Sequence, residues 1–172
     1  SATVGVLSGA TSGTMNLSSG TTVTVQSGTF AGTIAGTNGN LTKSTAGTLT
    51  LTGSNTYTGA TTVSAGTLQL GNGGTTGALS SRSPITNNAA IIFNRSNSVT
   101  QGTDFSGISG TGSVTQSGAG VLTLNTSNSY SGGTVLNSGT LAIAHTSGIG
   151  TGALTVNGGA IDNTSGAPLT LA

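Results

Sequence analysis

Few residues of this sequence could take part in acid–base chemistry. The chain has one histidine, His145, and two acidic residues, Asp104 and Asp162, which lie far apart in the sequence. Glycoside hydrolysis needs two carboxylates close together, and a catalytic triad needs a serine beside a histidine that an acid orients. No Gly-x-Ser-x-Gly elbow in a strand-to-helix context supports a triad. We therefore expect a protein that is not an enzyme, without catalytic residues, and we place His145 in a turn that follows a strand.

Metal and cofactor sites are not expected either. His145 with one aspartate supplies too few ligands for a closed metal site, and the chain has no cysteine. The glycine-rich segments 107–112 and 148–152 lack the lysine and the following helix of a phosphate-binding loop. Both segments are predicted to be turns.

The composition favours many short strands joined by tight turns. Gly, Thr, Ser and Asn make up 104 of the 172 residues, and these four types are poor in helix interiors. Only 3% of residues are charged, against roughly 25% in average soluble proteins. The three basic residues, Lys43, Arg82 and Arg95, cannot neutralise several phosphates, so nucleic acid is not an expected partner. No apolar run approaches the ~18 residues of a membrane-spanning helix, so we expect no direct membrane insertion of this segment.

Apolar and polar residues alternate with a period of two in several short segments. Gly47-Thr-Leu-Thr-Leu51 recurs as Gly66-Thr-Leu-Gln-Leu70, and 120–124 recurs with the same offset as 139–143. The segments 154–156 and 169–171 show the same alternation. Alternate side chains of a strand point to opposite faces. The residues expected to face a core are Leu49, Leu51, Leu68, Leu70, Leu122, Leu124, Leu141 and Ile143.

The spacing between equivalent strands predicts a solenoid. About 19–23 residues are too many for a hairpin but match one coil of a three-sided parallel β-helix, whose rungs stack at roughly 4.8 Å. We expect an all-β fold of roughly eight coils over residues 1–172, about 40 Å long. An isolated coil cannot bury its apolar residues, and open ends expose unpaired strands. We therefore expect a single segment of a longer rod, which continues into further coils of the same chain or stacks end to end with other copies.

A longer repeat contains these strands. Residues 41–70 and 114–143 align without a gap, and half of the aligned positions are identical. Both contain the pattern Asn-x-Tyr-x-Gly-x-Thr between two Leu-containing strands, at 55–61 and 128–134. This arrangement resembles the passenger-associated transport repeat of bacterial autotransporters. The second copy departs from the pattern mildly, at Val121, Thr126 and Ile143.

The resemblance implies a right-handed parallel β-helix that is exported through an outer-membrane β-barrel and exposed at the bacterial cell surface. Such passengers often serve adhesion, aggregation or biofilm formation. We therefore expect an extracellular structural or adhesive stalk, with host or matrix surface glycans or proteins as partners and no cofactor.

Two alternatives stay open. The chain could be a subunit of self-assembling extracellular fibres, or an ice-binding solenoid with flat rows of exposed threonines. The pairs Thr22/Thr24 and Thr48/Thr50 favour such rows, but Gln69 and Ala142 interrupt them at equivalent outward positions.

Tyr57 and Tyr130 occupy equivalent positions, and we expect them to pack at a corner of the coil rather than to form a sugar-stacking platform. The segment 81–112 departs from the repeat pattern and holds both arginines. We interpret it as one coil with a variable edge, and as the best candidate for a protruding or partner-contacting face.

Overall fold

The computed structural model describes residues 1–168, in which every strand pair is parallel and no helix occurs. The predicted strand at Leu169–Leu171 lies outside the described residues. Within them, no helix is long and apolar enough to cross a membrane. The strands are β1 (Ala2–Gly9), β2 (Thr14–Asn16), β3 (Thr22–Phe30), β4 (Thr33–Ala35), β5 (Asn40–Lys43), β6 (Thr48–Leu51), β7 (Thr61–Val63), β8 (Thr67–Leu70), β9 (Ile85–Asn87), β10 (Ala90–Phe93), β11 (Val99–Thr100), β12 (Ile108–Ser109), β13 (Ser113–Gln116), β14 (Val121–Leu124), β15 (Thr134–Leu136), β16 (Thr140–Ile143), β17 (Leu154–Val156) and β18 (Ala160–Asn163).

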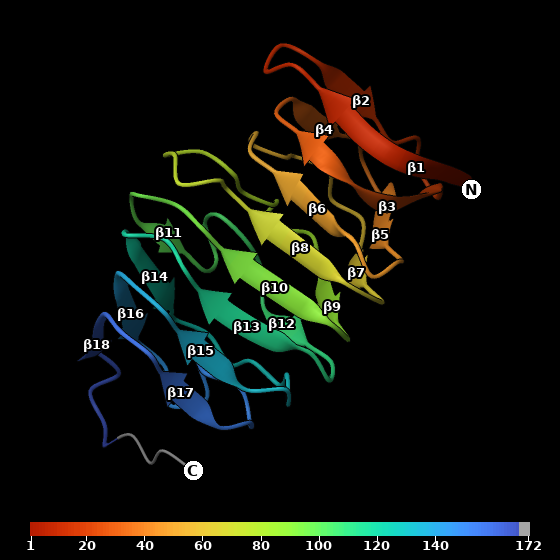
Figure 1. Cartoon of the computed structure of the whole chain (residues 1–172). Helices are drawn as coiled ribbons and strands as arrows, with labels where there is room; N and C mark the ends of the chain where they lie inside the picture. The colour runs from red at the N-terminus through yellow and green to blue at the C-terminus, as the bar shows by residue number, and fades with distance from the viewer. Residues whose placement is uncertain (169–172) are drawn as a thin grey trace.

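The strands stack into a β-solenoid of about eight turns with three faces, as predicted (Figure 1). The first face consists of β5, β7, β9 and β12 with the N-terminal halves of β1 and β3. The second face consists of β6, β8, β10, β13, β15 and β17 with the C-terminal halves of β1 and β3. The third face holds β2 and β4 toward one end and β11, β14, β16 and β18 toward the other.

The register between stacked strands gives the length of each coil. Leu49 is paired with Leu68, and Leu68 is paired in turn with Ile91, which is a longer step along the chain. Leu122 is paired with Leu141, a step equal to that from Leu49 to Leu68. The repeated interval in the sequence is therefore one full coil, and the variation in coil length lies in the turns between the strands.

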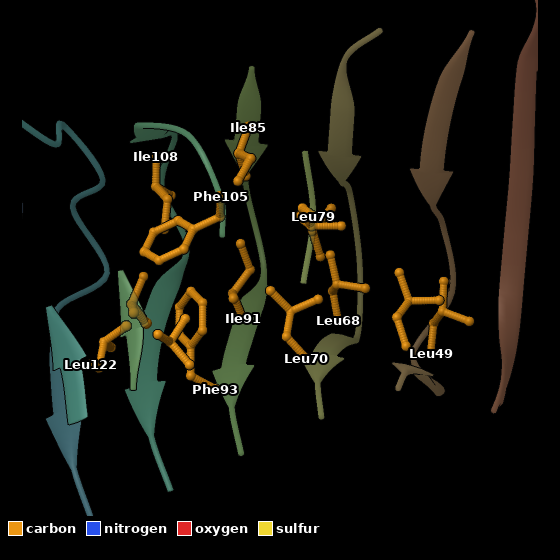
Figure 2. Packing of buried hydrophobic residues seen from close by; sticks show 14 of the residues in the cluster. Leu49, Leu68, Leu70, Leu79, Ile85, Ile91, Phe93, Phe105, Ile108 and Leu122 are labelled. Carbon is orange, nitrogen blue, oxygen red and sulfur yellow. The ribbon is translucent and has the colours of Figure 1, made fainter. Parts of the chain in front are cut away.

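The core runs through the solenoid as a stack of inward side chains (Figure 2). The eight leucine and isoleucine side chains predicted to face inward are at most 1% exposed. Phe93 and Phe105 are buried in this core, with ring centroids 4.7 Å apart. Burial of this continuous apolar column stabilises the fold, because no single coil encloses its own side chains.

The segment 81–112 is largely part of the rod rather than a protrusion, whereas its role as a partner-contacting face stays a prediction. It contributes β9, β10, β11 and β12. Because β12 pairs with β9, the segment makes one full coil and begins the next. Phe93, Arg95 and Phe105 are buried, because they lie at inward positions between neighbouring coils. Arg82, Asn88 and residues 96–98 are among the exposed positions of the segment.

The outward position Ala142 also differs from expectation, since it is only 7% exposed. Its small side chain lies in register between Thr123 and Asp162, which are both larger.

Candidate functional site

Each repeat turns a corner at an asparagine that joins three successive coils. The side-chain oxygen of Asn55 accepts a hydrogen bond from the backbone N–H of Ile34 in the preceding coil, at 2.9 Å. Its amide nitrogen donates to the carbonyl of Ala78 in the following coil, at 2.8 Å. The corresponding partners of Asn128 are the N–H of Ile108 and the carbonyl of Gly148, at 2.8 and 2.6 Å. Both asparagines are only 4% exposed, so these bonds satisfy polar groups that water cannot reach.

The tyrosine of each corner points into the core, and its hydroxyl group contacts a threonine hydroxyl. The hydroxyl of Tyr57 shares a hydrogen bond with Thr61 Oγ1 at 2.6 Å, and Tyr130 shares one with Thr134 Oγ1 at 2.7 Å. Both rings have no exposed surface, and burial raises the pKa of each phenol to about 12. The rings therefore cannot serve as a sugar-stacking platform, and their predicted packing role is confirmed.

The glycine of the pattern is required by a close approach between coils. A Cβ atom at Gly59 would lie 2.2 Å from the carbonyl oxygen of Gly39, which is far closer than any real contact. The corner pattern Asn-x-Tyr-x-Gly-x-Thr is thus a device for stacking coils: the asparagine bridges them, the tyrosine fills the interior, the glycine admits the neighbouring backbone and the threonine satisfies the phenol.

The two repeats occupy different faces of the solenoid. The first repeat begins on the first face with β5 and continues on the second face with β6. The second repeat begins on the second face with β13 and continues on the third face with β14. The motif is therefore rotated by one face between its two copies. Residues that are equivalent in sequence do not form a shared surface on one side of the rod.

Lys43 is an unexpected core residue. It is 1% exposed at the end of β5, and its ammonium donates to the carbonyls of Thr45 and, at 3.1 Å, of Ala65. Burial lowers the pKa of this ammonium. In the second repeat the equivalent residue is Gln116, whose side-chain amide donates to the carbonyls of Gly118 and Gly120 at 2.9 and 3.0 Å. Both side chains cap the carbonyls of a turn.

The residues that could do acid–base chemistry either lie apart from one another or make structural contacts. Nδ1 of His145 accepts from the N–H of Ser147 at 3.0 Å in a turn after β16, as predicted. Asp104 pairs with Arg95 at 3.3 Å and accepts from the N–H of Thr100 at 2.8 Å. Asp162 is exposed on β18. Within residues 1–168 no group of three or more His, Cys, Asp or Glu side chains could hold a metal ion.

The glycine-rich segments differ slightly from their predicted structure. Residues 148–152 form turns and bends, whereas 107–112 includes the short strand β12 at Ile108–Ser109. No helix follows either segment within the described part of the chain, which a phosphate-binding loop would require.

A groove of about 390 Å³ crosses three successive coils on the third face. It is lined by residues 54–56, 58, 78–82, 103 and 104. The third face has no regular strand between β4 and β11, only an isolated bridge between Ser54 and Ala78. Irregular backbone therefore replaces the sheet there, and the surface is hollowed. Sequence patterns did not reveal this groove, because the three lining segments meet only through the stacking of coils.

The comparisons with known proteins agree with the fold. The passenger-associated-transport-repeat family matches residues 41–70 and 114–143. These ranges contain β6 to β8 and β14 to β16 in full and all but the first residue of β5 and β13, with one corner pattern in each. Neither the curated proteins nor the solved structures include a significant match to the chain.

Proposed function

We propose that this chain is an autotransporter passenger domain that serves as a structural and adhesive stalk at the bacterial cell surface. The proposal is supported by the two passenger-associated transport repeats that the chain carries in a parallel β-solenoid. The stalk is extracellular and holds its contact surfaces away from the cell. It does not turn over a substrate.

One observation carries this proposal: the polar residues that recur in the two repeats are buried inside the rod and form hydrogen bonds there. The asparagine, tyrosine and threonine of each corner are buried and bonded to neighbouring groups of the stack. An enzyme would instead gather such side chains in a cleft with perturbed titratable groups. Repeats that build a rod and leave a hydroxyl-rich, nearly uncharged exterior suit contact with other surfaces.

Adhesion by the isolated chain tests the proposal. Beads coated with the purified 172-residue chain should bind cells of the source bacterium or host epithelial cells, and soluble chain should compete. His145→Ala and Asp162→Asn should leave binding unchanged, because neither side chain belongs to a cluster of functional groups. Coated beads that bind no better than beads carrying an unrelated neutral protein would contradict adhesion, and hydrolysis of a surface polysaccharide by the pure chain would contradict a non-enzymatic role.

End-to-end association is part of the proposal. The exposed large hydrophobic side chains are Val6, Val156 and Ile161 at 68, 50 and 42%, all near the outermost described coils. Further coils of the same chain or other copies would cover them. Sedimentation velocity at increasing concentration should show oligomers whose size changes little with salt, since few charges are involved. A monomer at every concentration would contradict fibre formation by the isolated chain.

The register of the first face favours a second candidate function, ice binding. Five threonines and one serine stand in one continuous row across six strands: Thr3, Thr24, Thr42, Thr62, Thr86 and Ser109. The rows through Thr22 and Thr50 are irregular, as expected, because Asn40 and Gln69 interrupt them. The hydroxyls of Thr24, Thr42, Thr62 and Thr86 bond to no other group within residues 1–168, so they stay available to ordered water.

Thermal hysteresis measures this second function directly. The chain should lower the freezing point without lowering the melting point, and Thr42→Tyr should abolish the effect by placing a ring over the row. Thr115→Tyr, on the second face, is the matched control. Absence of thermal hysteresis in the unaltered chain would contradict an ice-binding function.

A further inference from the structure

The groove on the third face carries a cationic group that pairs with no carboxylate of the described chain. Arg95 and Asp104 neutralise each other at its margin, at 3.3 Å. Arg82 lines the groove, is exposed and has no carboxylate within 4.0 Å among the described residues. Asp104 also lines the groove, but its carboxylate is paired with Arg95, so Arg82 is the charged lining residue without an ion pair in the described chain.

Hydroxyl groups line the groove together with this guanidinium. Ser54, Thr56, Ser81 and Thr103 all line the groove, and all four are exposed. Their hydroxyls make no hydrogen bond to other groups of the described chain, so they are free to donate to and accept from a ligand. The few apolar lining residues, Ala78 and Leu79, offer no deep pocket for an apolar side chain.

We propose that this groove binds an acidic oligosaccharide, with the guanidinium of Arg82 holding a sugar carboxylate and the surrounding hydroxyls bonding to the sugar hydroxyls. A guanidinium binds a carboxylate through two parallel hydrogen bonds, which gives the contact both strength and direction. A volume of about 390 Å³ lies within the usual range of ligand sites. A single cation with no second free basic group beside it in the described chain does not suit a polyphosphate or a nucleic acid.

The groove is built from several coils. Its three lining segments belong to successive coils, so one ligand in the groove can meet residues of all three. The backbone of these segments is fixed by the bonds of Asn55 to Ala78 and of the N–H of Leu79 to the carbonyl of Asp104, at 2.8 and 2.9 Å. The site is thus built on the corner that the repeat itself positions. The inference rests on the proposed adhesive function, for which it names the ligand class.

Nuclear magnetic resonance titration of the full chain tests the site. The probes are a hyaluronan tetrasaccharide and tetragalacturonate, which carry carboxylates, and chitotetraose, which is neutral. The acidic probes should shift the amide signals of residues 54–58, 78–82 and 103–104, and added salt should weaken binding. Arg82→Gln should weaken binding about tenfold or more, because one charge-assisted contact is lost. Asp162→Asn, which also changes one exposed charge, should bind as the unaltered chain does.

Three results would overturn the inference: no shifts at these residues with either acidic probe, equal binding of chitotetraose, or unchanged affinity in Arg82→Gln. The amide spectrum of Arg82→Gln checks that the fold is kept, as expected for an exposed residue. The bead assay separates this result from the proposed function. Beads that bind cells equally well with Arg82→Gln would contradict the groove as the adhesive site and leave adhesion standing. A groove that binds acidic sugars on beads that bind no cells would contradict adhesion and leave the groove standing.

Discussion

The hydroxyl of Tyr57 lies 2.6 Å from Oγ1 of Thr61, and the same threonine oxygen lies 2.7 Å from Oγ of Ser83 in the next coil. All three side chains are at most 1% exposed. The corner tyrosine of one coil is thereby connected to the coil that stacks on it.

Removing the shared hydroxyl should destabilise the rod. Thr61→Val keeps the side-chain shape but leaves the phenol of Tyr57 buried without its partner, so we expect a loss of about 1–3 kcal/mol in the free energy of unfolding. Thr62→Val is the matched control, because Thr62 is the outward neighbour on β7 and its hydroxyl has no partner among the described residues. Urea denaturation measures both, and an equal loss in the two variants would contradict a special role for Thr61.

The bridging asparagines should be more sensitive than exposed asparagines nearby. Asn128→Ala breaks the bonds to the N–H of Ile108 and the carbonyl of Gly148, and leaves these buried backbone groups unsatisfied. The expected loss is about 3 kcal/mol, with lower hydrogen-exchange protection in both adjoining coils. Asn125→Ala, at an exposed position in the same turn, should change stability by less than about 0.5 kcal/mol. A loss of protection confined to the coil of Asn128 itself would show that the residue does not join the coils.

Stability should fall at high pH because of the two buried tyrosines. Their pKa values in the folded chain are raised to about 12 from 10.0, so between these values the unfolded chain has released protons that the folded chain still holds. Stability is then fully present below pH 10 and is lost as the pH rises toward 12, by about 2–3 kcal/mol for each tyrosine. The lowered pKa of Lys43 acts in the opposite direction, since the folded chain releases that proton first.

Urea midpoints measured from about pH 8 to 12 check this dependence, together with the phenolate absorbance of the folded chain. A variant with Tyr57→Phe and Tyr130→Phe should lose the alkaline fall in stability. Phenolate absorbance that rises near pH 10 before unfolding would show that the rings are accessible.

The equivalence of Lys43 and Gln116 predicts which replacement the core accepts. Lys43→Gln should retain stability within about 1 kcal/mol, because an amide at this position caps the turn that follows the strand in the second repeat. Lys43→Ala should lose about 2–3 kcal/mol, since it opens a cavity and leaves the carbonyls of Thr45 and Ala65 without a donor. Thermal unfolding ranks the variants, and equal losses for glutamine and alanine would show that packing alone matters.

The sequence by itself determined the strands, their inward residues and the interval of stacking. Alternation is a local property, because the backbone of a strand turns successive side chains to opposite faces whatever its neighbours are. That is why Leu49 and Leu51 could be placed inside, and why the recurrence of the Gly47 segment at Gly66 correctly paired Leu49 with Leu68. The equivalent positions of Tyr57 and Tyr130 in the two repeats placed Tyr57 at a packed corner.

Only the tertiary structure decided which residues of different coils meet. The row from Thr3 to Ser109 advances by unequal steps along the chain, so no fixed period in the sequence marks it. The rotation of the second repeat by one face, the burial of Arg95 against Asp104 and the groove beside Arg82 depend on the same register. The physical reason is that turns of variable length separate the strands, and the alignment of one coil on the next is fixed by hydrogen bonds between residues about twenty positions apart.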